Sequence, residues 1–206
     1  WAPRTDRRVG PGSELGRALP CRGSIGTAST HLLSDRAKTF VRRDLRAKRY
    51  DRAVRAHLTQ FEIAWEDPEE NFGAIERLLA SAGAQPGDLV VLPEMFDTGF
   101  SLNTEVTADR DGRTLAFLER LARERQVTVQ GGRTALGDGG AKATNRAPVF
   151  GPGGELLCEY AKIHPFSFGR EPERFEGGRE VMTYMWSTGC DALRVCPAIW
   201  LSPATS

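Results

Sequence analysis

Apolar residues from about residue 54 onwards recur with two periods, one typical of strands and one typical of helices. Phe61, Ile63 and Trp65 alternate with polar or small neighbours, which predicts a half-buried strand. Asp67-Pro68-Glu69-Glu70 then predicts a helix start, because aspartate caps a first turn and proline fits its first position. The helix should end at Gly83, and its buried face should comprise Phe72, Ile75, Leu78, Leu79 and Ala82.

Further apolar segments continue this alternation of strands and helices. Leu89-Val90-Val91-Leu92 is an unbroken apolar run stopped by Pro93, which predicts a short strand buried on both faces. Residues 127–131 predict the next strand. Between the two lies a second amphipathic helix, whose apolar face is formed by Leu115, Leu118, Leu121 and Ala122.

The last third of the chain is rich in predicted strands. A hairpin is expected from residues 143–150 and 155–162 around Gly151-Pro152-Gly153-Gly154, and two more strands at about 180–186 and 192–199. Strands that alternate with helices and then run together indicate an α/β layered fold.

Two of the predicted strands end in charged residues. Glu94 follows Pro93 and precedes the apolar pair Met95-Phe96, and an ionised carboxylate in such surroundings costs several kcal/mol unless a cation is near. Lys162 ends a second strand, within Tyr160-Ala161-Lys162-Ile163-His164-Pro165-Phe166. Each charge alone could be a solvated side chain at a loop mouth, but together they predict a shared site.

The segment from Pro93 to Phe100 and the strand before Lys162 resemble the nitrilase, or carbon-nitrogen hydrolase, superfamily, and within it the omega-amidase branch. The strand at residues 57–61 and Thr144-Asn145-Arg146 followed by Gly153-Gly154 are also similar to family segments, in the family's order. The resemblance covers residues 54–199. It implies an α-β-β-α sandwich, of which this chain would supply an incomplete part.

The resemblance also implies which residues do chemistry. The family works with a cysteine, a glutamate and a lysine, and passes through a thioester intermediate. Glu94 would be the general base, Lys162 would stabilise the oxyanion, and Glu171 would pair with Lys162 and orient water.

Substrate contacts are assigned on the same resemblance. Phe100 and Phe166 could line the substrate slot, although aromatic residues at strand ends more often belong to the core. Arg170 is the candidate for the carboxylate of a small α-keto acid amide. No cofactor is implied, and the expected partner is a small-molecule amide, with a homodimer as the usual assembly of the intact family enzyme.

The family's nucleophilic cysteine has no counterpart here. It lies in a segment of the form I-C-Y-D-L-R-F-P, whereas this chain passes from Cys196-Pro197-Ala198-Ile199 to Trp200 and a non-homologous tail at 200–206. Cys196 would lie about 13 Å upstream at roughly 3.3 Å per residue, too far to replace it. We expect a frameshift or faulty gene boundary after Ile199 and an inactive chain. The alternative is a non-catalytic scaffold or binding module of the same fold.

Charge divides the chain unevenly, although its net charge is +1. Residues 1–54 carry 13 Lys and Arg against 5 Asp and Glu, which leaves 15 against 22 for the remainder. Residues 1–53 should form a separate basic leader, with 1–33 disordered and a weak helix at 35–52. The leader lacks interleaved aromatic residues or any recognisable module, so we expect no nucleic-acid partner.

The remaining composition narrows the class of protein. No run of 18 apolar residues occurs, so no membrane span is expected. The 4 cysteines have no CxxC spacing and only 3 histidines accompany them. Neither zinc nor a disulfide framework is therefore expected, and a reducing cytoplasm fits Cys21, Cys158, Cys190 and Cys196 best.

Overall fold

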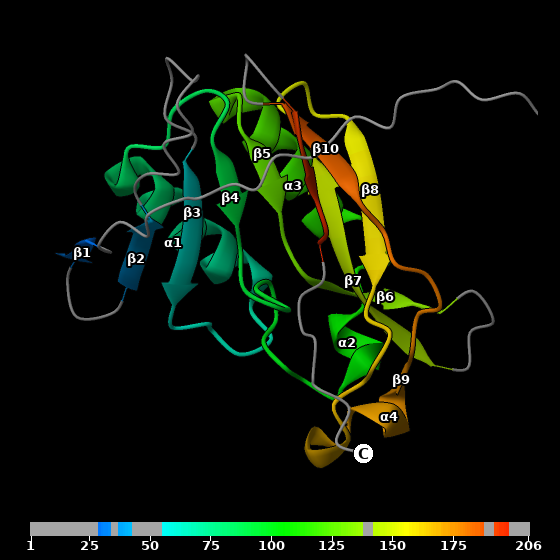
Figure 1. Cartoon of the computed structure of the whole chain (residues 1–206). Coiled ribbons are helices and arrows are strands. Elements are labelled where there is room, and N and C mark those ends of the chain that lie inside the picture. Colours follow the sequence, from blue (N-terminus) through cyan, green and yellow to red (C-terminus); the bar gives the residue numbers. More distant parts are fainter. Residues whose placement is uncertain (1–28, 34–36, 43–54, 138–141, 188–191, 198–206) are drawn as a thin grey trace, which may run out of the picture.

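The computed structural model describes residues 29–33, 37–42, 55–137, 142–187 and 192–197 (Figure 1). A nine-stranded mixed sheet, ordered β1-β2-β3-β4-β5-β7-β6, forms its centre, and β8 and β9 both pair with β7. Its strands are β1 Ser29–Leu33, β2 Ala37–Arg42, β3 Ala56–Phe61, β4 Leu89–Val91, β5 Thr128–Gln130, β6 Arg133–Leu136, β7 Ala143–Phe150, β8 Leu156–Ala161 and β9 Phe175–Glu176.

Helices and one further hairpin complete the described part. The helices are α1 Pro68–Ala82, α2 Thr104–Thr107, α3 Arg113–Arg125 and α4 Glu171–Arg174, with a 3-10 turn at Ser167–Gly169. β10 Tyr184–Ser187 and β11 Ala192–Val195 form a separate antiparallel pair. The predicted α/β class is confirmed: β3, β4 and β5 run parallel, and α1 and α3 make the connections between them.

Helix α1 begins and ends where the sequence predicts. The Asp67 carboxylate accepts a hydrogen bond from the Glu70 backbone N–H at 3.2 Å, and Gly83 takes the left-handed conformation with φ 65°. Such a C-terminal glycine avoids the clash that a Cβ would cause. Of the predicted inward stripe, four members are buried and the fifth, at residue 82, is half-buried.

Two apolar clusters lie on opposite faces of the sheet. The first packs α1 and α3 against it, with the Phe72 and Phe117 rings stacked at 4.2 Å between centroids. The second lies under β10, where the Trp186 indole N–H donates to the Gly87 carbonyl at 3.1 Å. The sheet is therefore covered by helices on one side and by the β10–β11 hairpin on the other.

The first predicted strand is shorter than expected. β3 ends at Phe61, and Ile63 and Trp65 lie in the following loop, where Trp65 is 63% exposed. The Asn71 side chain accepts from the Ala64 backbone N–H and donates to the Ala64 carbonyl, both at 2.7 Å. These bonds satisfy backbone groups that a continuing strand would have paired with a neighbour, so alternation alone misled the prediction.

The helix expected at 35–52 and the irregular chain expected through residue 33 are wrong where the structure describes them. β1 and β2 form an antiparallel pair there, and β2 pairs antiparallel with β3. β3 would otherwise carry an unpaired edge, and the addition of strands removes it. The other residues of the predicted leader lie outside the described ranges, and its boundary at residue 53 stays a prediction.

The hairpin of β7 and β8 is confirmed, but β6 was not predicted. β6 pairs antiparallel with β7, from Arg133↔Arg146 to Leu136↔Ala143. β10 begins at Tyr184, later than expected, and β11 ends at Val195. Residues 198–199, predicted to continue that last strand, lie outside the described part.

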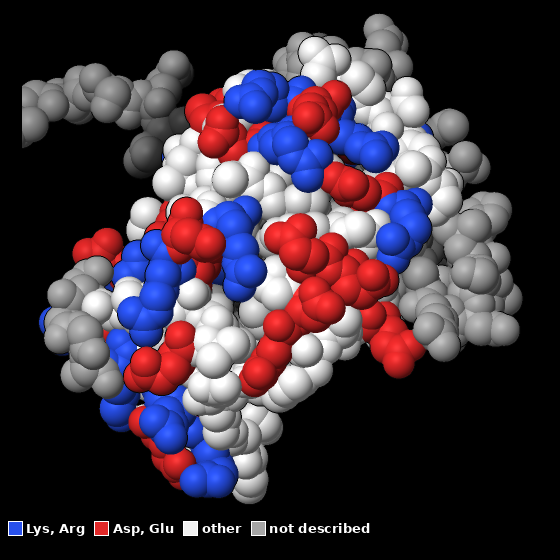
Figure 2. Space-filling view, turned by 180° about the vertical axis from the view of Figure 1, so that it is seen from behind, with Lys and Arg blue, Asp and Glu red and all other residues white. Residues whose placement is uncertain are grey.

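Charge on the face seen in Figure 2 is mixed: acidic and basic side chains lie interspersed there. Ion pairs join the two long helices, since the Arg120 guanidinium contacts Glu76 at 2.7 Å, and Arg123 pairs with Glu119 along α3. The face in Figure 2 therefore differs from the uniformly basic surfaces to which nucleic acid binds. Among the described helices, none has the length and apolar character needed to cross a bilayer.

Candidate active site

Three segments far apart in the sequence meet at the edge of the sheet where the parallel strands end. Glu94 follows β4, Lys162 follows β8, and Glu171 is the first residue of α4. The loop after Glu94 turns sharply, since Met95 has φ 48°. A Cβ at residue 132 would lie 2.6 Å from the Met95 backbone nitrogen, so only glycine permits this close approach.

The structure brings the three predicted catalytic side chains together. The Lys162 Nζ lies 2.9 Å from Glu94 Oε1 and 2.8 Å from Glu171 Oε2. Both distances are those of charge-assisted hydrogen bonds. The ammonium is therefore clamped between two carboxylates, as the joint spacing in the sequence predicted.

Burial differs among the three groups. The side chains of Lys162 and Glu171 are 2% and 0% exposed, whereas that of Glu94 is 19% exposed. The Phe166 backbone N–H donates a further hydrogen bond to Glu171 Oε2. Glu171 is thus fixed inside the protein, and Glu94 is the member of the cluster that solvent or a ligand can reach.

Asn145 completes the cluster and was missed as a site residue. Its Nδ2 donates to Glu94 Oε1 at 2.5 Å and to Glu171 Oε1 at 3.1 Å. Asn145 is 2% exposed, but it stands between Thr144 and Arg146 in β7, so no local pattern of the sequence marks it as buried. From the sequence, Thr144-Asn145-Arg146 had indicated only the hairpin.

Of the three residues predicted to contact the substrate, the structure places Phe100 beside the cluster, whereas Phe166 and Arg170 have exposed side chains. The Phe100 ring lies beside the ammonium, with its centroid 5.3 Å from Lys162 Nζ. Phe166 is 43% exposed and its ring packs 6.1 Å from that of Phe168. Arg170 is not brought into the cluster: its side chain is 71% exposed and forms two hydrogen bonds with Glu173. An arginine at the start of a four-residue helix, with an acid three positions on, satisfies itself locally.

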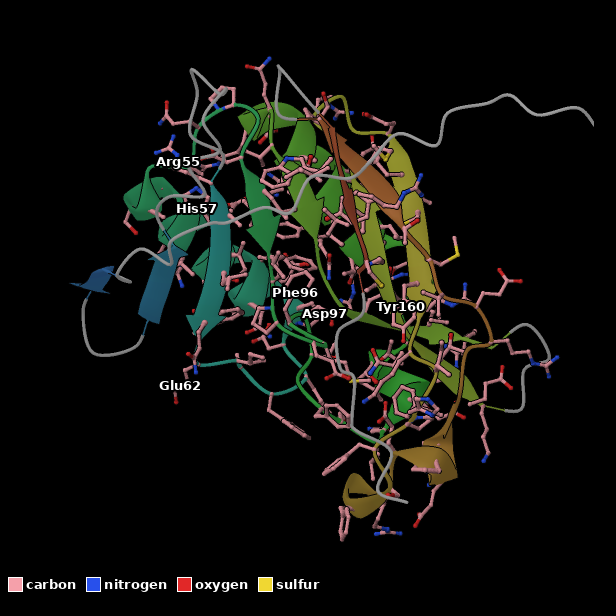
Figure 3. The ribbon with its side chains drawn as sticks, in the orientation of Figure 1. Arg55, His57, Glu62, Phe96, Asp97 and Tyr160 are labelled. Atoms are coloured by element: carbon pink, nitrogen blue, oxygen red, sulfur yellow. The ribbon has the colours of Figure 1, made fainter. Side chains whose placement is uncertain are left out.

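Asp97 is a second buried carboxyl, three residues beyond Glu94, and Figure 3 shows it beside Phe96 at the lower end of β4. Burial raises the pKa of Asp97 to about 6, and the nearby Asp109 contributes in the same direction. The Thr114 hydroxyl donates to Asp97 at 2.8 Å and partly opposes that rise. With a pKa of about 6, the Asp97 carboxyl changes its charge between mildly acidic and neutral pH.

A second cluster of charged side chains, Asp88 with Arg55 and His57, lies where β3 and β4 begin, at the end of these strands opposite the site; Figure 3 labels Arg55 and His57. The Asp88 carboxylate contacts the His57 Nε2 at 2.8 Å and the Arg55 Nε at 3.3 Å. It also accepts from the Gln85 backbone N–H. These contacts tie β3 to the turn before β4 and hold the strand ends opposite the site.

The chain that leads to the expected nucleophile approaches the same edge of the sheet. The Gln130 amide at the end of β5 donates to the Pro197 carbonyl at 3.2 Å, and Gln130 lies next to Val91 in the sheet register. Trp200 lies outside the described residues. Cys196 is exposed, and no contact of it with the cluster occurs in the described part. There, no group of three His, Cys, Asp or Glu residues is placed to hold a metal ion.

Comparison with known proteins identifies the family. The sequence model described as "Carbon-nitrogen hydrolase" matches residues 55–196, which is more than half of the chain. The chain belongs to the carbon-nitrogen hydrolase family. The strands and loops that carry Glu94, Lys162 and Glu171 all lie within the matched range, and residue 200 lies beyond it.

Several family members are similar to the chain over part of their length. A nitrilase from Pyrococcus abyssi is 38% identical over 118 residues, which cover 54% of this chain and 43% of that protein. The omega-amidase YafV from Yersinia enterocolitica is 32% identical over 131 residues, 63% of this chain and 48% of that protein. The chain therefore spans a little under half the length of these curated relatives.

A solved structure supports the same assignment. XC1258 from Xanthomonas campestris, a CN-hydrolase superfamily protein, superposes with a TM-score of 0.61 at 30% identity. The superposition covers 69% of this chain and 51% of that one. The α/β fold is thus the family's own.

Proposed function

We propose that the described residues form the acid–base part of an amidase site that acts on small amides in the omega-amidase manner. The observation that carries this proposal is the pairing of Lys162 with both Glu94 and Glu171 inside the protein. A buried ammonium shared by two carboxylates, one of them partly exposed, combines a proton carrier with a cation for a developing oxyanion.

In this mechanism a cysteine thiol attacks the amide carbonyl carbon. Glu94 takes the thiol proton as the sulfur–carbon bond forms, and Lys162 faces the negative oxygen of the tetrahedral intermediate. Glu94 then delivers the proton to the nitrogen as the carbon–nitrogen bond breaks. Ammonia departs, and the acyl group remains bound to the sulfur as a thioester. Water oriented near Glu171 then attacks the thioester carbon and gives a proton to Glu94. The carbon–sulfur bond breaks, Glu94 returns the proton to the sulfur, and the acid product leaves the free thiol behind.

The relatives support a choice of substrate class. The similar proteins include omega-amidases and a 2-oxoglutaramate amidase from Bacillus subtilis, which is 29% identical over 123 residues. We therefore propose a small ω-amide that carries a carboxylate at its other end. Arg170 would need to leave Glu173 to bind that carboxylate, so a basic residue from outside the described part is the better candidate.

The nucleophile decides between activity and a binding role. After Cys196 the 206-residue sequence contains no cysteine, and Trp200 occupies the expected position. Loss of the nucleophile from a covalent enzyme lowers its rate on the order of a million-fold, as in a serine protease. We infer that this polypeptide does not hydrolyse amides as it stands, and its second candidate function is a scaffold that binds the same small amides.

The test begins with the coding DNA beyond the codon for Ile199, translated in all three frames. If another frame continues with Cys-Tyr-Asp-Leu-Arg, the protein from that frame should release ammonia from 2-oxoglutaramate. Its Glu94→Gln and Lys162→Met variants should then lose at least about a hundredfold in kcat. A frame without that segment, or an extended protein with no ammonia release, would leave only the scaffold function.

A further inference from the structure

The charge balance of the cluster leaves one carboxylate without a full partner. Glu94 and Glu171 both face the single ammonium of Lys162, at 2.9 and 2.8 Å. If all three are charged, the cluster carries a net charge of −1 in a place where Glu171 and Lys162 are almost entirely buried. Two carboxylates at one site repel each other unless further donors share the charge.

Asn145 supplies those donors from a single atom. Its Nδ2 carries two hydrogens, and one is directed to Glu94 Oε1 and the other to Glu171 Oε1. The amide thereby bridges the same two acids that the Lys162 ammonium bridges. Hydrogen bonds to ionised groups are shorter and stronger than those between neutral groups, and the contact to Glu94, at 2.5 Å, is short in this way, whereas the contact to Glu171, at 3.1 Å, is of ordinary length.

The other end of the amide fixes its orientation. Asn145 Oδ1 is buried and has no hydrogen-bond partner among the described residues. A flipped amide would place this oxygen against two carboxylates, so the donors must face the acids although an acceptor is left unpaired. An unpaired buried acceptor is unfavourable, and the bonds on the other side must outweigh it.

The backbone of Asn145 is tied to the same site. It lies in β7 between β6 and β8, and its carbonyl accepts a hydrogen bond from the Lys162 backbone N–H at 2.8 Å. Asn145, which contacts both acids through its side chain, is thus bonded through its backbone to Lys162, which carries the cation. The backbone of Asn145 cannot shift without moving the end of β8, which leads into Lys162.

We propose that Asn145 is a positioning residue that holds the carboxyl groups of Glu94 and Glu171 on either side of Lys162. This inference rests on the proposed function, since it assigns Asn145 the task of keeping the base ready to accept a thiol proton. In the proposed mechanism Asn145 exchanges no proton and forms no bond to the substrate; it acts through Glu94 and Glu171.

The first experiment compares two buried asparagines on the 206-residue chain. Asn145→Leu removes two donors to carboxylates, whereas Asn71→Leu removes two donors to the carbonyls of Ala64 and Asp97. Urea unfolding at pH 7, in the wild-type and the Glu94→Gln backgrounds, gives the ratio of unfolding equilibrium constants, asparagine variant over its parent. We expect the ratio for Asn145→Leu to be roughly tenfold larger in the wild-type background than beside Glu94→Gln, because a donor lost from a charged acceptor costs more than one lost from a neutral acceptor. The Asn71→Leu ratio should be the same in both backgrounds.

The second experiment uses a nearly isosteric change, which keeps the test open if the leucine variant fails to fold. Asn145→Asp places a third carboxylate against the two acids and should unfold much more readily than the wild type at pH 7. Adding Glu94→Gln restores the original charge and returns one amide donor to the pair. We expect the double variant to recover roughly tenfold of the lost equilibrium constant at pH 7.

The outcomes separate this inference from the proposed function. A ratio for Asn145→Leu that is the same with and without Glu94→Gln, or Asn145→Asp and Glu94→Gln effects that simply add, would overturn the positioning role and leave a structural asparagine. These measurements need no catalysis. An extended protein without ammonia release would instead overturn the proposed function while the coupling of Asn145 to the two acids stood.

Discussion

At the scale of single residues, Lys162 is the side chain whose loss should destabilise the site most. Its ammonium is 2% exposed and is the shared partner of a buried and a partly buried carboxylate. Removal of one partner from a buried ion pair is far more damaging than replacement of the whole group, because a charge is then left uncompensated. The pairing of Glu94 with Lys162 was predictable because each ends a predicted strand, where an isolated charge would be unfavourable, whereas Glu171 was assigned on the family resemblance.

Replacement of Lys162 by methionine tests how much its ammonium contributes to the stability of the fold. The variant keeps the length of the side chain but leaves Glu94 and Glu171 facing each other without a cation. We expect a loss of about 3–5 kcal/mol in the free energy of unfolding at pH 7, measured by urea titration. The control is Lys142→Met, an exposed lysine whose ammonium contacts only the Pro172 carbonyl among the described residues, and its loss should stay within about 0.5 kcal/mol. Equal losses would contradict the assigned burial of Lys162.

Asp97 gives the protein a predictable dependence on pH. Burial raises the pKa of Asp97 from 3.8 to about 6, so the folded state binds its proton more tightly than the unfolded state does. The free energy of unfolding should therefore fall as pH rises from about 4 to about 6, by up to roughly 3 kcal/mol from this group. Below the lower value both states are protonated and the contribution is constant.

The substitution that removes this dependence is Asp97→Asn, which cannot ionise and keeps an acceptor for the Thr114 hydroxyl. Urea unfolding between pH 4 and pH 7 should show a flatter profile for this variant than for the wild type. The exposed Asp111→Asn should leave the profile unchanged. A wild-type profile that does not fall over this range, or a variant with the same slope, would show that the buried Asp97 carboxyl does not cause the dependence.

At the scale of elements, local signals were readable and long-range pairing was not. The Asp67 cap and the Gly83 terminus set the bounds of α1 within a few residues of chain, so the sequence predicted them. β6 and the β1–β2 pair were missed because a strand in the sheet is defined by partners distant in sequence. Asn145 was missed for the same reason: its role exists only once β7, β8 and the loop after β4 are placed together.

Gly132 joins an element to the site and offers a test at this scale. The residue lies between β5 and β6, where an added Cβ would meet the Met95 backbone nitrogen at 2.6 Å and Glu94 Cα at 3.1 Å. Gly132→Ala should push the turn that carries Glu94 out of place and cost about 1–3 kcal/mol in thermal or urea unfolding. Gly73→Ala, inside α1, meets only the flexible end of Arg77 and should stabilise the protein slightly. An unchanged stability for Gly132→Ala would show that the turn can move freely.

At the scale of the whole molecule, the two faces of the sheet are covered unequally. The helices cover one face continuously, whereas the β10–β11 hairpin covers the other mainly over β4, β7 and β8. Leu58 in β3 shares a face with Ala56, which packs against the second cluster, yet Leu58 itself is 47% exposed. Leu156, Met185 and Leu193 are also exposed on β8 and the hairpin. A sheet with exposed apolar residues beside strand edges favours association between molecules.

We therefore expect the 206-residue chain to express poorly in soluble form and to self-associate. Light scattering after gel filtration should show species larger than one chain, in proportions that rise with concentration. Leu58→Glu should lower the associated fraction, because a charge on that face opposes contact between two apolar surfaces. The matched control is Val106→Glu, where the wild-type side chain is 57% exposed and belongs to the helix α2, not to the sheet. A monodisperse wild-type chain with cooperative melting would show that the hairpin alone protects this face, and equal effects of the two substitutions would show that net charge, not the sheet face, controls association.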